Sequence, residues 1–188
     1  MLVAEILLHR TRAENVVSVY RDFIKKVPDI RALSLRTESQ IEEMTKSLGL
    51  RWRGKLMIKM AKAMVNQFDG QIPCDLEELR DVPRIGDYIA SALLVFSCGR
   101  YLPLLDTNTV RITARYFGLN QSDGSRRMLK FHESVLFFVN PRDTISSYYA
   151  LIDLGALVCK SINPECFVCP LREGCNHYEG QASLYGGI

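Results

Sequence analysis

The sequence predicts an all-α protein whose helices form two lobes, residues 1–102 and 103–188. Apolar residues recur at helical spacing along most of the chain, for instance through residues 53–68. Segments that alternate strictly between apolar and polar residues, which are typical of half-buried strands, are nearly absent. The stretch GDYIASALLVFSCG, residues 86–99, is apolar on almost every side, and a helix of this kind is surrounded by protein.

The first lobe is expected to begin with a helix over residues 2–26 that is bent or broken near Arg12. A second helix is expected over residues 37–48, because Thr37 suits an N-cap and a glycine ends the pattern. The helix over residues 53–68 then stops at the polar sequence FDG.

A short helix should follow Asp75, because Glu78 stands three residues later, as in a capping box. Beyond the long apolar helix, the sequence predicts helices over residues 107–118, 125–139 and 144–158, and a frayed tail after Tyr178.

Composition and hydropathy argue against a membrane-spanning or a secreted protein. The chain has 188 residues, an apolar fraction of 47% and a formal net charge of +3, so it can bury a core and leans only weakly toward acidic partners. No apolar run approaches the roughly 18 residues of a membrane span. The opening MLVAEILLHR lacks the basic start and the cleavage site of a signal peptide. We therefore expect no membrane association and a reducing, cytoplasmic location, at the nucleoid if the source is prokaryotic.

The cysteines crowd the end of the chain. Four of the six follow the spacing C-x6-C-x2-C-x5-C; they are Cys159, Cys166, Cys169 and Cys175. In a reducing compartment such a cluster binds metal more often than it forms disulfides. Zinc sites usually have two C-x2-C pairs, whereas one pair flanked by single cysteines favours a larger iron–sulfur cubane. Cys74 and Cys98 are expected to be ordinary buried thiols.

This spacing resembles the [4Fe–4S] loop of the endonuclease III and adenine-DNA glycosylase family, which are helix–hairpin–helix DNA glycosylases. The resemblance covers roughly residues 1–178 and implies a [4Fe–4S] cluster on the four cysteines. It also implies a helix–hairpin–helix motif followed by an aspartate, and residues 76–97 followed by Asp106 match this order. The fold it implies has a DNA-binding cleft between the lobes.

The hairpin turn VPRIG suits phosphate binding. Pro83 ends the first helix, and Gly86 can adopt conformations that other residues avoid. Backbone amides near Gly86 and Asp87 would then start the second helix and hold a phosphate. The family's hairpin resembles LPGVG, so Arg84 replaces its first glycine. Either Arg84 adopts a glycine-like conformation, or the turn differs and Arg84 meets the phosphate directly.

Asp106 precedes TNTVRI, so it suits an N-cap. The resemblance implies that its carboxylate also stabilises the positive charge on a deoxyribose as the base departs. Both roles can coexist.

Tyr88 stands where the bifunctional members of the family carry a lysine that attacks the sugar. Tyrosine cannot form a Schiff base, so we expect base removal without strand cleavage. Tyrosine at this place is similar to the archaeal thymine-DNA mismatch glycosylases, as are EILLHRT and TVRITARYFG. That resemblance implies removal of thymine or uracil opposite guanine.

Three further residues are candidates for the site. Glu5 matches the general acid of the adenine glycosylases and could donate a proton or position water. Arg10 matches a position that fills the gap left by an extruded base. Trp52 lies in the basic sequence GLRWRGK, expected to be a loop, where an aromatic ring can stack on a base while the cations around it, Arg53 among them, hold phosphates. Cations of the second lobe are expected to contact phosphates or only solvent: Arg126, Arg127 and Lys130.

The expected protein is thus a monomeric DNA glycosylase that acts on double-stranded DNA containing a mismatched or damaged base. Two alternatives stay open. Glu5 favours an adenine glycosylase acting opposite oxidised guanine, although Tyr88 opposes it. A non-catalytic DNA-binding module with a structural metal would retain the cysteines but would not need Asp106.

Overall fold

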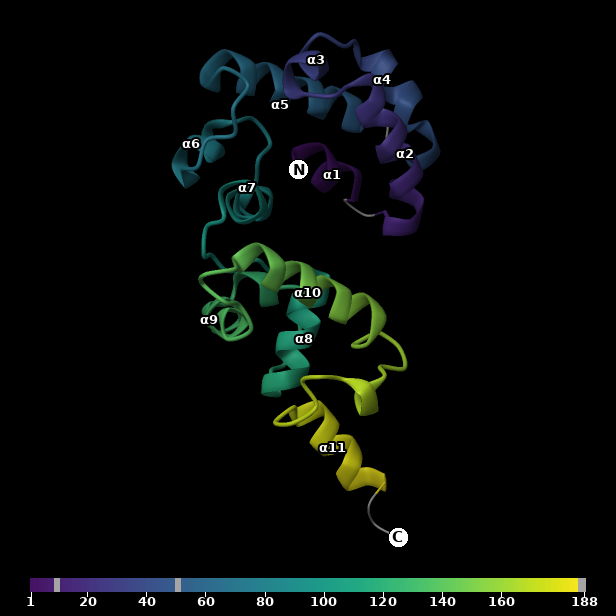
Figure 1. Cartoon of the computed structure of the whole chain (residues 1–188), viewed down its shortest axis with the longest axis vertical. Coiled ribbons are helices and arrows are strands. Elements are labelled where there is room, and N and C mark those ends of the chain that lie inside the picture. Colours follow the sequence, from purple (N-terminus) through teal and green to yellow (C-terminus); the bar gives the residue numbers. More distant parts are fainter. Residues whose placement is uncertain (9–10, 50–51, 186–188) are drawn as a thin grey trace. The chain divides into compact units, whose positions relative to one another are not determined.

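The computed structural model describes residues 1–8, 11–49 and 52–185 (Figure 1). All regular structure within these ranges is helical, so the predicted fold class is confirmed. The α-helices are α1 (Leu2–Leu8), α2 (Ala13–Lys26), α3 (Ile30–Ser34), α4 (Glu38–Thr45), α5 (Trp52–Phe68), α6 (Leu76–Asp81), α7 (Asp87–Cys98), α8 (Thr107–Phe117), α9 (Leu129–Leu136), α10 (Thr144–Leu157) and α11 (Asn176–Tyr185). Short 3-10 helices are η1 (Lys46–Leu48), η2 (Ser125–Arg127) and η3 (Cys166–Val168).

The chain forms two compact units, Met1–Cys98 and Gly99–Ile188, which we describe separately. None of the helices in the described ranges is long and apolar enough to cross a lipid bilayer.

In the first unit, α5 packs against α3 and α4, and α1 packs against α2, α5 and α7. The predicted break near Arg12 is confirmed, because Arg12 has extended backbone angles and is the N-cap of α2. Thr37 caps α4 with the reciprocal bonds of a capping box to Gln40, also as expected. The core consists mainly of large apolar side chains, including Phe23, Leu33, Ile41, Met57, Met60 and Met64.

Helix α3 is a feature that apolar periodicity did not predict. It has only five residues, too few to show a helical pattern. Asp29 caps it by accepting a hydrogen bond of 2.7 Å from the Ala32 amide.

In the second unit, α8 packs against α9, α10 and α11. The helices α8 and α10 approach closely at Gly155, where an added Cβ would stand 2.5 Å from the Cβ of Asn108. Gly118 ends α8 with a left-handed φ of 65°, as predicted. Core side chains in this unit include Val110, Ile112, Phe131, Val135, Tyr148 and Leu151.

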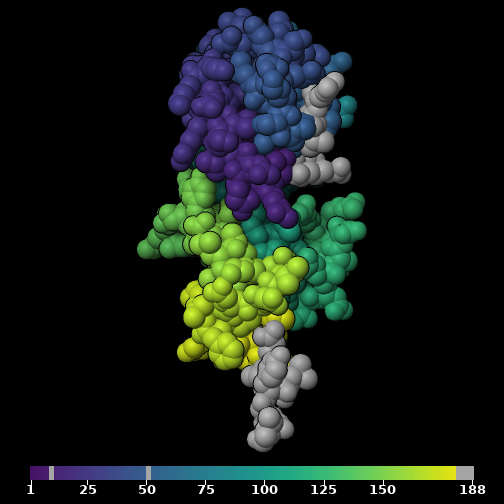
Figure 2. Space-filling view, turned by 90° about the vertical axis from the view of Figure 1, so that its right-hand side faces the viewer, coloured from purple at the N-terminus to yellow at the C-terminus, as the bar shows by residue number. Residues whose placement is uncertain are grey.

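The expected fraying after Tyr178 is wrong, because α11 continues to Tyr185. This helix is weakly patterned, and its contact with α8 supplies support that the sequence pattern does not show. In the space-filling view the segment of residues 159–175 lies at the surface of its unit (Figure 2). Ile162, Phe167 and Val168 of this segment are strongly exposed.

Candidate functional site

The helix–hairpin–helix begins at a well-capped short helix. The Asp75 side chain accepts hydrogen bonds from the amides of Glu77 and Glu78, at 2.9 and 3.1 Å, so the predicted cap of α6 is confirmed. Val82 is extended, with ψ of 124°, as expected for a residue before proline. Helices α6 and α7 pack together across the turn (Figure 1).

Arg84 holds the left-handed position of the turn, with φ of 71°. Of the two alternatives, the glycine-like conformation is therefore the one adopted. A left-handed conformation costs an ordinary residue about 1–2 kcal/mol. Gly86 is not among the residues with positive φ, so the expectation that it supplies the unusual backbone conformation is wrong. The position of Gly86 is open, because a Cβ added there would meet nothing within 4 Å.

The start of α7 is accessible. Arg84, Gly86 and Asp87 are all exposed, and the first amides of the helix have no acceptor within it. The intrahelical pattern begins with the Ala90 amide, which donates to the Gly86 carbonyl at 3.0 Å. Such a helix start attracts anions through amides that have no acceptor within the helix, and through its dipole.

Arg80 of α6 forms ion pairs with two carboxylates, those of Asp87 and Glu77. The Arg80 guanidinium lies 3.2 Å from the Asp87 carboxylate and 2.6 Å from that of Glu77. The hydrogen bond that Arg80 donates to Glu77, followed by the one that it donates to Asp87, raises the pKa of Arg80. These groups are exposed, so the pairs orient the hairpin more than they stabilise it.

Tyr88 and Glu5 lie on neighbouring helices of the first unit. Tyr88 is 39% exposed on α7, whose opposite face is buried through Ala90 and Leu94. Glu5 is half-buried on α1, beside the buried Ile6. The helices that carry these two predicted side chains are in contact, because α1 packs against α7.

Trp52 is not in a loop, as the sequence predicted, but is the first residue of α5, with 47% of its surface exposed. Its neighbour Arg53, grouped with the phosphate-binding cations of that expected loop, is fully buried. Arg53 donates to the Leu7 carbonyl at 3.1 Å and to the Thr11 hydroxyl at 2.7 Å. The expectation that Arg53 holds a phosphate is wrong, because its buried side chain joins α5 to the end of α1. Arg10, the other proposed gap-filling residue, lies outside the described residues.

Asp106 is the N-cap of α8, as predicted. Its Oδ1 accepts from the Thr109 amide at 2.7 Å, while its own amide donates to the Thr109 hydroxyl at 2.8 Å. Its Oδ2 accepts a longer hydrogen bond of 3.5 Å from the Asn108 side chain. The side chain is half-buried. One carboxylate oxygen is thus occupied by the cap, and the other is only weakly engaged.

The backbone before Asp106 is fixed by Tyr148 from α10. The Tyr148 hydroxyl donates to the Leu102 carbonyl at 2.7 Å and accepts from the Leu104 amide at 2.8 Å. Burial raises the pKa of this hydroxyl, so it stays protonated as a donor.

Arg111 connects the start of α8 to α10 and the cysteine segment. It donates to the Asn108 side chain at 2.8 Å, to the Gly155 carbonyl at 2.6 Å and to the Cys159 carbonyl at 2.8 Å. Only 9% of this arginine is exposed, and burial lowers its pKa. Sequence reasoning missed its role, although two arginines four residues apart in a half-buried helix could have indicated it.

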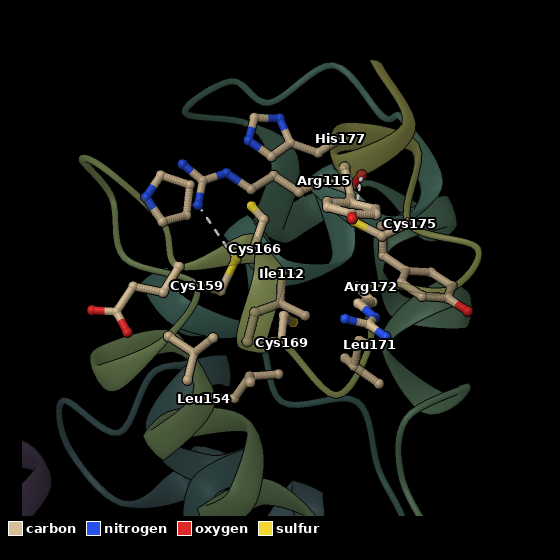
Figure 3. Close-up of a pocket in the computed structure, with 15 residues that line it drawn as sticks. Ile112, Arg115, Leu154, Cys159, Cys166, Cys169, Leu171, Arg172, Cys175 and His177 are labelled. Carbon is tan, nitrogen blue, oxygen red and sulfur yellow. Dashed lines mark hydrogen bonds between the residues drawn. The ribbon is translucent and has the colours of Figure 1, made fainter. Parts of the chain in front are cut away.

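The four clustered cysteines line one pocket at the end of α10, together with Arg115 and His177 (Figure 3). Arg115 donates to the Cys159 Sγ at 3.3 Å and to the Lys160 carbonyl at 2.6 Å. Burial raises the pKa of Cys166, and the other cysteines raise it further. Among the described residues, no three acidic, histidine or cysteine side chains are arranged to hold a single metal ion.

The remaining cysteines contradict the prediction. Cys74 and Cys98 are not buried thiols but form a disulfide with a Cα–Cα distance of 5.8 Å, and Cys74 is exposed. Periodicity could not show this pairing, because the two residues are brought together only by the hairpin.

The basic residues near η2 are exposed. Arg126 donates to the Thr107 hydroxyl at 2.8 Å, so it lies beside the start of α8. For Arg127 and Lys130 both expectations, phosphate contact or solvation, stay predictions.

Comparison with known proteins matches residues 3–136 to the model of the HhH-GPD superfamily of base excision DNA repair proteins. The chain belongs to this superfamily. The family membership inferred from the hairpin and the cysteine spacing is therefore confirmed.

Among curated relatives, a thymine-DNA glycosylase from Aeropyrum pernix is 35% identical over 95% of this chain and 82% of its own length. A thymine/uracil-DNA glycosylase from Pyrobaculum aerophilum is 33% identical over 95% of this chain and 80% of its own. The solved structure of a thermostable thymine-DNA glycosylase superposes with a TM-score of 0.85 at 27% identity, over 95% of this chain and 83% of that one. An adenine DNA glycosylase from Buchnera aphidicola is 33% identical over 94% of this chain, which spans only 50% of that protein.

Proposed function

We propose that this member of the superfamily is a DNA glycosylase that removes thymine or uracil paired with guanine. The observation that carries the proposal is the Asp106 carboxylate at the start of α8. Its Oδ1 is held by the cap, and its Oδ2 has only the 3.5 Å contact with Asn108. Relatives named for thymine and uracil release match nearly the whole chain.

The reaction is hydrolysis of the bond between the base and C1′ of its deoxyribose. Positive charge develops on the sugar as the bond breaks, and the fixed negative charge of Asp106 offsets it. The backbone amides beside Gly86 hold a phosphate of the same strand. Glu5 either positions the water and takes up its proton as the oxygen bonds to C1′, or it protonates the base, which departs with the electrons of the broken bond. The chain acts as a monomer on duplex DNA.

Residues 159–175 hold a [4Fe–4S] cluster in this proposal. The fit rests on one observation: all four cysteines line one pocket and so offer an all-sulfur donor set. A cubane needs ligands further apart than one ion does, and an all-sulfur donor set suits iron. When bound, the cluster cross-links the segment. The basic Arg115 at the Cys159 sulfur offsets the negative charge of its ligands.

A panel of duplexes tests the substrate. G·T, G·U and A·oxidised-G pairs are incubated with the protein and then heated in alkali, which breaks the strand at abasic sites. Cleavage at thymine and uracil supports the proposal. Cleavage at adenine alone supports the second candidate, an adenine glycosylase, which the adenine-specific relatives and Glu5 favour. No cleavage with retained DNA binding would leave a non-catalytic binding module.

The nature of residue 88 predicts the product. Tyrosine has no amine, so the strand should stay intact until alkali is added. Tyr88→Lys should gain strand nicking and a DNA adduct that borohydride traps. Tyr88→Phe is the matched control and should form no adduct. If the lysine variant also forms none, residue 88 does not face the sugar.

A further inference from the structure

A disulfide closes the helix–hairpin–helix at its base. Cys74 directly precedes Asp75, the N-cap of α6, and Cys98 is the last residue of α7. Their disulfide joins positions 24 residues apart, so the covalent loop encloses α6, the turn and α7. All of these residues belong to the first unit, whereas the four clustered cysteines belong to the second.

Within the enclosed hairpin, α6 has less support than α7, which is buried on several sides. Helix α6 has six residues, far fewer than an isolated helix needs. Its turn carries Arg84 at φ of 71°. Buried Leu79 and Val82 hold α6 in place, but the ion pair between Arg80 and Asp87 is exposed and contributes little. The disulfide therefore limits the separation of α6 from α7.

We infer that Cys74 and Cys98 form a redox site that sets the stability of the DNA-binding hairpin. Oxidised, the pair holds the two helices together; reduced, it releases the ends of α6 and α7. The exposure of Cys74 leaves its sulfur accessible to a dithiol reductant.

The dithiol supplies the electrons and protons that reduce the disulfide. One of its thiolates attacks the Cys74 sulfur, the S–S bond breaks, and Cys98 leaves as a thiolate that takes up a proton. The second thiol of the reductant then attacks the mixed disulfide and releases Cys74. Two electrons and two protons pass to the protein, and the reductant becomes a disulfide. A small-molecule or protein disulfide reverses the reaction.

Hydrogen exchange of the full chain tests the inference. Exchange is measured with and without dithiothreitol, both for the native chain and for the double variant Cys74→Ser/Cys98→Ser. Reduction should speed exchange in residues 76–98 on the order of 100-fold and lower Tm by about 10 °C. The double variant should match the reduced chain and should not respond in these residues. It also controls for any effect of the reductant on the clustered cysteines.

Peptide mapping after alkylation under non-reducing conditions reports the bond itself. Recovery of the 74–98 cross-link, lost on adding dithiothreitol, supports the site. Two alkylated thiols even after incubation with oxidised dithiothreitol would overturn it, as would equal exchange in oxidised and reduced chains. These measurements use no DNA, so a failure of the proposed glycosylase activity leaves them intact. Weaker DNA binding by the reduced chain follows only where the proposed function also holds.

Discussion

Two helix starts in this protein use the same backbone geometry in opposite ways. At α8 one of the first amides is satisfied from within, because Asp106 accepts from the Thr109 amide at 2.7 Å. At α7 the residues Gly86 and Asp87 are exposed, and a Cβ added at Gly86 would meet nothing within 4 Å. Every helix start has unpaired amides and a positive dipole end. The neighbouring side chains decide whether that end is filled by the protein's own carboxylate or left for an external anion.

The difference assigns separate tasks to the two starts. The open start of α7 suits a phosphate, which is a negative charge brought by the ligand. The closed start of α8 holds a negative charge that the protein brings, fixed in direction by its cap. Binding and charge stabilisation can therefore be tested one at a time.

The largest effect is expected from Asp106→Asn. Asparagine is also a good N-cap, so α8 should keep its start while the negative charge is lost. Single-turnover base release from a G·T duplex should fall by roughly 100- to 1,000-fold, with Tm nearly unchanged. Asp143→Asn makes the same change at the cap of α10 and should leave the rate intact. An unchanged rate in Asp106→Asn would refute the catalytic role.

The next largest effect is expected from Arg111→Gln, which removes the support behind the start of α8. The buried carbonyl of Gly155 and the half-buried carbonyl of Cys159 would both lose the donor that Arg111 provides. Urea unfolding should show a loss of about 3 kcal/mol, since each unsatisfied buried group costs roughly 1–3 kcal/mol. Arg126→Gln removes an exposed arginine near the same helix start and should change stability by less than about 0.5 kcal/mol. Equal losses in both variants would contradict the structural role of Arg111.

A smaller effect should follow from Gly86→Glu, which closes the open start of α7 with a carboxylate. The added Cβ meets nothing within 4 Å, so the fold should be retained. DNA affinity should fall about tenfold, as expected for the loss of a charge-assisted phosphate contact. Gly180→Glu makes the same charge change at another open position. A similar loss in that control would mean that net charge, and not the helix start, is responsible.

The smallest effect separates the conformation of Arg84 from its charge. Arg84→Gly and Arg84→Ala both remove the cation, but only glycine accepts φ of 71° without strain. The glycine variant should be more stable than the alanine variant by about 1 kcal/mol in urea unfolding. If Arg84 contacts a phosphate, both variants should reduce the salt dependence of DNA binding by about one charge. Equal stability of the two variants would contradict the left-handed turn.

Much of the local structure could be predicted, because helix capping depends on residues close in sequence. Thr37, Asp75 and Asp106 were each expected as N-caps, and each accepts an amide of the following turn. The family could also be recognised from the sequence, since cysteine spacing and the VPRIG turn are local patterns. The frayed tail was predicted wrongly, because α11 is stabilised by contact with α8 and not by its own pattern.

The candidate site was predicted less completely. Arg53 was read as a surface cation because its neighbours are basic, yet it is buried against the end of α1. The role of Arg111 depends on carbonyls 44 and 48 residues away. No local pattern contains these partners.

The sequence by itself determined the helices, their caps, the hairpin turn and the family, because each depends on neighbouring residues. Only the tertiary structure decided that Arg84 is left-handed, that Arg53 and Arg111 are internal donors, and that Cys74 is bonded to Cys98. Burial and covalent pairing depend on which distant segments meet. That depends on the packing of whole helices, which composition and spacing do not encode.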